Sequence, residues 1–318
     1  MILLSPYDQK QQEGKIRHET AKYRWLSLGF VAVSLLIILF FFIGNYKINY
    51  IQDDYYVYGD EKFRIDPEFN DDSVFNIVII DTITPIDTLQ PLPDDVKHVD
   101  LRANFTEIKS QGQQGACLAF TLSSVMEYMV NVAKQEYADF SEAFLYYEAR
   151  RKAGDEGRDI GSYYSYALQT LQNEGICSEN YMPYNQYDYL SMPSSMAYNN
   201  AIQNRISDVR SLDFENIESL KSALYNGYPV AISVNLYSSF GNGNGGVIPM
   251  PKSRETSYGA HGSHAMVIVG YDDDEQWFIV RNSWGTNFGD NGYCYMPYAY
   301  ISDEDLTNYA CVITKLRQ

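Results

Sequence analysis

The chain has 318 residues, enough for one large domain or two small ones with appendages. Hydrophobic residues make up 45% and charged residues 20% of it, which are ordinary proportions for a globular protein with a sizeable core. The net charge of −17 argues against nucleic-acid binding and against docking on anionic lipid through basic patches. Four cysteines are too few for a disulfide scaffold and show no paired metal spacing. We expect neither a metal nor a cofactor.

An uncharged apolar run of about nineteen residues begins at Trp25 and ends at Ile43. At 1.5 Å per residue it nearly spans a hydrocarbon core of about 30 Å. A cleaved signal peptide is the alternative, but such peptides have shorter apolar cores, and the residues after this run form a poor cleavage site. We expect residues 25–44 to be an uncleaved transmembrane signal anchor. Lys and Arg cluster before the run, so the positive-inside rule makes residues 1–24 a cytoplasmic tail and the rest extracytoplasmic, periplasmic or on the cell surface.

Residues 45–91 form a connector whose first half is acidic and rich in tyrosine, without a clear period. Residues 73–83 are a β-branched apolar run, which predicts a strand. Prolines at 85, 91 and 93 then interrupt regular structure. Two interpretations stay open: a plain linker, or a short pro-segment that covers a site of the following domain.

A globular domain begins at about Leu92 and is expected to occupy residues 92–318. Helical spacing and capping residues predict helices over residues 117–134, 141–151, 162–175 and 219–227. Apolar runs then predict strands over residues 229–237, 264–272, 276–284 and 310–316. Helices first and strands second indicate an α+β domain with two unlike halves.

Cys117 lies where a Gly-rich loop becomes a helix, in QGQQGACLAF. A thiol at a helix N-terminus experiences the positive end of the helix dipole and free backbone N–H groups, which lower the pKa of such a thiol. A buried structural cysteine is the alternative. Position alone leaves both open. Cys294 and Cys311 could form a disulfide, which would leave Cys177 single.

A thiol nucleophile needs a base, and the chain has four histidines: His18, His98, His261 and His264. The first lies on the predicted cytoplasmic side, and the second lies in the approach to the domain. His264 begins a predicted strand, whereas His261 lies in a long Gly-rich loop, and a sheet fixes a side chain better than a loop does.

The neighbouring predicted strand offers a partner for this histidine. Asn282, in RNSWG, could accept a hydrogen bond from the ring N–H and so hold the tautomer. Trp284 could then shield that hydrogen bond from water.

Three segments together resemble the papain-like cysteine peptidases: QGQQGACLAF, HAMVIVGY and RNSWGTNFGDNGY. Gln111 precedes Cys117 by six residues, as in that family's nucleophile motif. The small residue and the Gly-Tyr pair that follow His264 favour it over His261. Weaker matches extend the resemblance from about Leu92 to about residue 314. Three motifs in the right order are far beyond a chance match.

The resemblance implies a two-lobed fold, in which a helical lobe carries Cys117, a β-rich lobe carries His264 and Asn282, and a cleft lies between them. The Gln111 side chain and the Cys117 backbone N–H would hold the oxyanion. It also implies backbone contacts from Gly161 and Ser162 to a bound peptide.

Other matches of the same motifs bear on the substrate. The residue before the histidine, Ser263, would shape the pocket for the substrate's second side chain, and because it is small and neutral we expect no strong charge preference there. Two positions depart from the family: Leu118 replaces a Trp, and Gln114 replaces a disulfide-bonded Cys. The family's long helical pro-region does not fit in residues 45–91.

The resemblance therefore predicts a cysteine-type peptidase that hydrolyses peptide or protein substrates through a thioester acyl-enzyme. Two alternatives stay open. One is a catalytically idle binding module of the same shape, and the other is a transpeptidase or amide ligase that uses the same site. Neither the oligomeric state nor the natural substrate follows from the sequence.

Overall fold

The computed structural model describes residues 50–52, 55–58, 61–65, 90–242 and 244–317, all within one compact unit. The predicted tail, the predicted anchor and the predicted strand at 73–83 lie outside these residues, so they remain predictions. In the described ranges, no helix is both long enough and apolar enough to cross a membrane.

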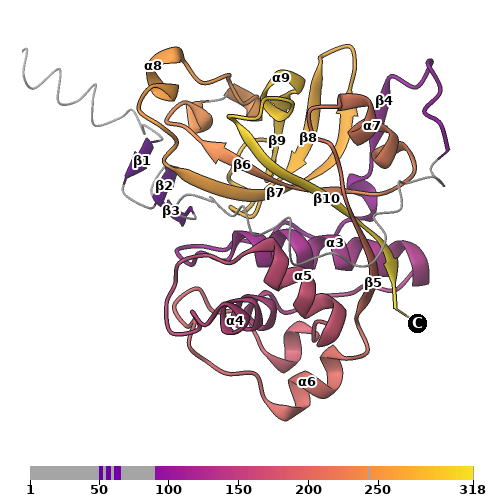
Figure 1. The fold of residues 1–318 in the computed structure, drawn as a ribbon, viewed down its shortest axis with the longest axis vertical. Helices are drawn as coiled ribbons and strands as arrows, with labels where there is room; N and C mark the ends of the chain where they lie inside the picture. Colours follow the sequence, from indigo (N-terminus) through magenta and orange to yellow (C-terminus); the bar gives the residue numbers. More distant parts are fainter. Residues whose placement is uncertain (1–49, 53–54, 59–60, 66–89, 243, 318) are drawn as a thin grey trace, which may run out of the picture. The chain divides into compact units, whose positions relative to one another are not determined.

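The first half of the domain is helical, as expected. Its helices are α3 (Cys117–Lys134), α4 (Glu142–Ala153), α5 (Tyr164–Asn173) and the short α6 (Ser195–Ala201). Ser141 caps α4 by accepting from the Phe144 N–H at 3.0 Å, and Gly154 ends it in the left-handed conformation. Figure 1 shows α3 between the sheet and the other three helices, and α3 contacts both β7 and α4.

The second half is a seven-stranded sheet with the order β5-β10-β6-β7-β8-β9, and β4 also pairs with β7. All of these pairs are antiparallel. The strands are β4 (His98–Asp100), β5 (Ile206–Ser211), β6 (Val230–Leu236), β7 (Gly262–Asp272), β8 (Trp277–Arg281), β9 (Tyr293–Pro297) and β10 (Thr307–Leu316). The helices beside them are α7 (Ile217–Tyr225), α8 (Ser253–Thr256) and α9 (Tyr298–Ile301). Single 3₁₀ turns are η1 (Arg102–Asn104), η2 (Glu179–Tyr181), η3 (Phe240–Asn242) and η4 (Asn244–Gly246).

The connector carries a second sheet, which the sequence analysis missed. It consists of β1 (Tyr50–Gln52), β2 (Tyr55–Tyr58) and β3 (Glu61–Arg64), in that order and antiparallel. Strands of three or four residues are too short to establish a period of two, so the pattern gave no signal.

The α+β expectation is confirmed for the described domain, with two adjustments near the site. The predicted strand at 276–284 ends at Arg281, which leaves Asn282 and Trp284 beyond the strand. The possible Cys294–Cys311 disulfide is wrong, because none of the four cysteines is in a disulfide. The two lie in β9 and β10, which three strands separate in the sheet order, too far for two sulfurs to bond.

Candidate active site

Cys117 is the first residue of α3, which begins where the sequence predicts. Ala116 at the N-cap supplies no side-chain hydrogen bond, so it does not satisfy any of the N–H groups in the first turn of α3. The Cys117 side chain is buried. It belongs to the same packed cluster as Ala265 of β7, the residue after His264.

His264 and Asn282 form the pair that the sequence predicts. Asn282 Oδ1 lies 2.7 Å from His264 Nε2 and also accepts from the Ser283 N–H at 2.7 Å. The pair forms because β7 and β8 are adjacent antiparallel strands and Asn282 directly follows β8. Both residues are buried, and burial lowers the pKa of His264 to about 4, against the opposing effect of the Asn282 hydrogen bond.

The other ring nitrogen of His264 is available for proton transfer. Nδ1 is buried and has no hydrogen-bond partner within the described part of the chain. Trp284 is fully buried, and its ring centroid lies 4.6 Å from that of His264. At this position, Trp284 can shield the His264–Asn282 hydrogen bond from water.

Gln111 links the loop before Cys117 (residues 111–116, here called the nucleophile loop) to the segment that follows β8 and carries Asn282. Its backbone N–H donates to the Ser283 carbonyl at 2.8 Å, and its Oε1 accepts from Ser283 Oγ at 2.7 Å. These bonds fix the side-chain amide so that Nε2 donates to the carbonyls of Gln114, at 3.0 Å, and Arg64, at 3.1 Å. The Arg64 carbonyl belongs to β3 of the connector.

The end of β3 therefore lies in the site. Phe63 stacks on Trp284 with ring centroids 5.2 Å apart and an interplanar angle of 15°. Phe63 and Ile65 are both buried. The Arg64 guanidinium lies 3.8 Å from the Asp159 carboxylate. The sequence is compatible with a covering segment, but no pattern in it marks these residues.

Gly161 and Ser162 lie just before α5 and next to the nucleophile loop. Tyr146 OH donates to Asp159 Oδ1 at 2.5 Å and accepts from the Gly161 N–H at 3.3 Å. Asp159 Oδ1 also accepts from the Gly115 N–H at 2.9 Å. A Cβ atom on Gly115 would lie 2.9 Å from the Gly161 nitrogen, so only glycine fits there. These polar contacts join the two segments. The chain has Gln114 where the family has a disulfide-bonded Cys, so no disulfide formed at that position can contribute.

Ser162 and Ser263 are both buried. The Ser162 hydroxyl has no hydrogen-bond partner among the described residues. Ser263 Oγ donates to Asn235 Oδ1 at 3.0 Å and accepts from Asn308 Nδ2 at 3.1 Å. The Ser263 hydroxyl is thus held by two amides rather than by a charged group.

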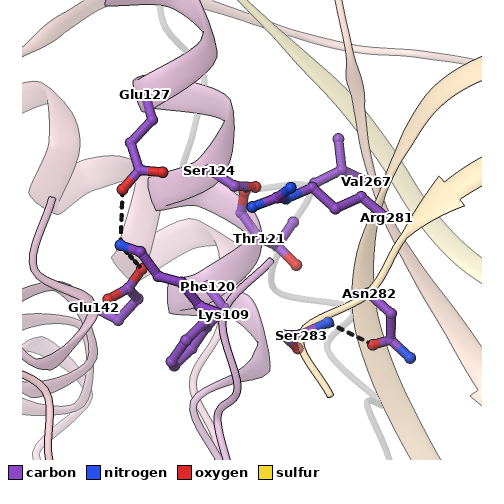
Figure 2. Close-up of a pocket in the computed structure, with 10 residues that line it drawn as sticks. All are labelled: Lys109, Phe120, Thr121, Ser124, Glu127, Glu142, Val267, Arg281, Asn282 and Ser283. Atoms are coloured by element: carbon purple, nitrogen blue, oxygen red, sulfur yellow. Dashed lines mark hydrogen bonds and ion pairs between the residues drawn. The ribbon is translucent and has the colours of Figure 1, made fainter. Parts of the chain in front are cut away.

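A buried charge cluster beside the site was missed by the sequence analysis. Lys109 Nζ lies 2.9 Å from Glu127, 2.6 Å from Asp139 and 2.8 Å from Glu142. Figure 2 shows Lys109, Glu127 and Glu142 on one side of a pocket, whose opposite side carries Asn282 and Ser283. Each acid is at least 18 residues from Lys109 in sequence, so no local pattern marks the cluster.

Burial is the largest influence on the pKa values of Glu142 and Lys109. It raises the pKa of Glu142 to about 7, although Lys109 opposes the shift. The pKa of Lys109 is raised because its carboxylate neighbours outweigh the effect of burial. Across the described ranges, no group of three or more His, Cys, Asp or Glu side chains is arranged to hold a metal ion.

The sequence model of the papain family cysteine proteases matches residues 92–313 of this chain. The chain belongs to this family. An uncharacterized peptidase C1-like protein of Acanthamoeba polyphaga mimivirus is 29% identical over 232 residues, which are 69% of this chain and 73% of that protein. Cathepsin S of Bos taurus is 30% identical over 211 residues, which are 64% of this chain but only 60% of cathepsin S.

Solved structures of papain-family proteins share the fold. Xylellain, a cysteine protease from Xylella fastidiosa, superposes with a TM-score of 0.64 at 28% identity, covering 85% of this chain and 97% of that one. Procathepsin L 3 of Tenebrio molitor superposes with a TM-score of 0.57 at 23% identity, covering 71% of each chain. At that identity the second likeness concerns the fold alone.

Proposed function

We propose that this papain-family chain is an active cysteine peptidase with Cys117 as nucleophile, His264 as base, Asn282 as the residue that orients the base and Gln111 as an oxyanion donor. The observation that carries the proposal is the hydrogen bond from Gln111 Nε2 to a main-chain carbonyl of another segment, at 3.1 Å. A peptide group therefore already lies against the amide that would stabilise the oxyanion.

The geometry supports a thioester mechanism. Asn282 holds the proton on His264 Nε2, which leaves Nδ1 to take the thiol proton of Cys117. The thiolate attacks the substrate carbonyl carbon, and the resulting oxyanion accepts from Gln111 Nε2 and the Cys117 N–H. The imidazolium then protonates the leaving amine, and the acyl group stays on sulfur. Water, deprotonated by His264, releases the acid and restores the thiol.

We also propose that part of the connector, residues 61–65, acts as a short pro-segment. Phe63 covers Trp284, and Arg64 engages Gln111, so a substrate must displace this segment. A plain linker has no physical need for a fully buried Ile65 or a stacked Phe63. The segment is a strand, unlike the family's long helical pro-region.

The proposed enzyme is a single-pass membrane protein that faces the extracytoplasmic space. This rests on the apolar run at residues 25–44 and the positive charges before it. Protease treatment of cells stripped of their outer layers, with the anchoring membrane intact, tests the orientation: the catalytic domain should be degraded and a tag on residues 1–24 protected. Protection of both ends would overturn it.

The peptidase proposal is tested by labelling the full chain with an irreversible thiol-directed peptide probe. We expect modification at Cys117, none in Cys117→Ala, and faster modification in Phe63→Ala. Peptide binding without modification of Cys117, in both the natural chain and Phe63→Ala, would favour the idle binding module.

A cleavable peptide substrate tests the other alternative. If an added amine gives an amide product in place of the acid, the same site is a transpeptidase or amide ligase.

A further inference from the structure

Arg64 contacts the domain through both its main chain and its side chain. Its carbonyl accepts from Gln111 Nε2 at 3.1 Å, and its Nη1 lies 3.8 Å from Asp159 Oδ2. The two side chains of the ion pair are 17% and 14% exposed, so the contact is partly open to solvent. One residue thus places its carbonyl at the oxyanion donor and its cation at Asp159.

The carboxylate of Asp159 is held in a fixed orientation. Oδ1 accepts from the Gly115 N–H at 2.9 Å and from Tyr146 OH at 2.5 Å, which leaves Oδ2 directed at Arg64. Two other charges on the same loop, Asp155 and Arg158, form an ion pair with each other. A negative charge fixed two residues before Gly161, beside the nucleophile loop, is suited to attract a cation on a bound peptide.

We propose that Asp159 is a specificity-determining residue that selects arginine or lysine at the substrate residue directly before the bond that is cleaved. The carbonyl that a nucleophile attacks belongs to that residue, and Arg64 shows where its side chain then lies. The inference rests on the proposed function, because that function makes Gln111 the oxyanion donor. Sequence reasoning did not single out Asp159.

The selectivity arises from an ion pair without a close hydrogen bond. Pairs of this kind contribute modestly and are screened by salt. We expect a preference of about twofold to fivefold for a cationic over an isosteric neutral side chain at low ionic strength, which is the range that such an ion pair supports. The preference should decrease as salt is added.

The test uses two irreversible peptidyl fluoromethyl ketones that differ only in the residue next to the reactive group, arginine or its neutral isostere citrulline. The full chain is labelled at Cys117, and the ratio of the two rates is measured. Residues 61–65 compete equally with both probes, so they slow both reactions without changing the ratio. We expect the arginine probe to react faster, with a ratio near one in Asp159→Asn.

Two matched variants separate selectivity from a general structural effect. Asp155→Asn removes the same charge from the same loop and should keep the ratio. Tyr146→Phe removes a hydrogen bond to Asp159 but no charge, and should change both rates together. Equal rates of the two probes in the natural chain, or an undiminished ratio in Asp159→Asn, would overturn the inference. Failure of both probes to modify Cys117, in the natural chain and in Phe63→Ala, would instead overturn the proposed function.

Discussion

The main-chain carbonyl of Arg64 accepts a hydrogen bond from Gln111 Nε2 at 3.1 Å, so the amide that we propose as an oxyanion donor already holds a peptide group of its own chain. This contact connects the proposed chemistry with its control. The same amide that would stabilise an oxyanion also helps to keep residues 61–65 in place. Loss of the Gln111 amide and loss of a side chain that holds residues 61–65 in place should therefore have opposite effects on activity.

Gln111→Ala should lower kcat/KM for a peptide substrate by about 10²–10³-fold, because one oxyanion donor is lost. Ser283→Ala should cost less, about twofold to tenfold, because it removes only the 2.7 Å hydrogen bond that orients Gln111. Steady-state kinetics on both variants measure the difference, and urea unfolding checks that both are folded. Equal losses in the two variants would contradict a direct role for Gln111.

Phe63→Ala should speed the modification of Cys117 by a peptidyl probe. Burial of a Phe side chain stabilises by about 1.5–3 kcal/mol. Truncating it should therefore increase the fraction of molecules in which residues 61–65 are displaced from the site by about tenfold or more. Lys62→Ala is the matched control, since Lys62 is exposed on the neighbouring position of the same strand. Labelling rates of the natural chain and the two variants should differ only for Phe63→Ala. No change in that variant would remove the pro-segment from the proposal.

His264 should lower the free energy of unfolding of the protein in acid. Its pKa is about 4 in the folded state and near 6.5 in the unfolded chain, so the unfolded state binds an extra proton between these values. The free energy of unfolding should therefore rise with pH from 4 to 6.5, by about 3 kcal/mol from this group, and then level off. His264→Gln should remove that contribution, as urea unfolding across this pH range can measure. An unaltered slope would contradict the buried, neutral imidazole.

Glu142 should act in the opposite direction. Burial raises its folded pKa from 4.5 to about 7, so the folded state keeps a proton that the unfolded chain releases. Its contribution to stability is fully present below pH 4.5 and declines as the pH rises through 7. Glu142→Gln cannot titrate, so its stability should rise more steeply with pH than that of the natural protein. A shallower rise in this variant would contradict the sign.

Lys109→Met should destabilise the domain by about 3–5 kcal/mol, because three carboxylates around the ammonium lose their cation, and two of them are buried. Arg158→Met is the comparison. It breaks an ion pair whose arginine is 64% exposed and should cost about 1 kcal/mol or less. Thermal unfolding of the two variants at pH 7 measures the contrast. Similar losses would show that the Lys109 cluster is no more than a surface pair.

Local patterns in the sequence were sufficient for α3, α4 and α5, but they did not predict the short α6. The spacing of apolar residues placed α3 at Cys117–Lys134, and Ser141 marked the start of α4, because helix contacts and caps lie within four residues of each other. The order of the three motifs and their family resemblance predict Gln111, Cys117, His264 and Asn282 as one set.

Only the tertiary structure decided what surrounds that set. It excluded the disulfide between Cys294 and Cys311, gathered three acids around Lys109, and brought Arg64 to both Gln111 and Asp159. These partners are 18 to 95 residues apart in sequence, or lie on strands separated by three others, and no periodicity of two or 3.6 records such distances. A residue type states which bond a side chain can make, whereas the packing of the whole domain determines which atom is there to make it.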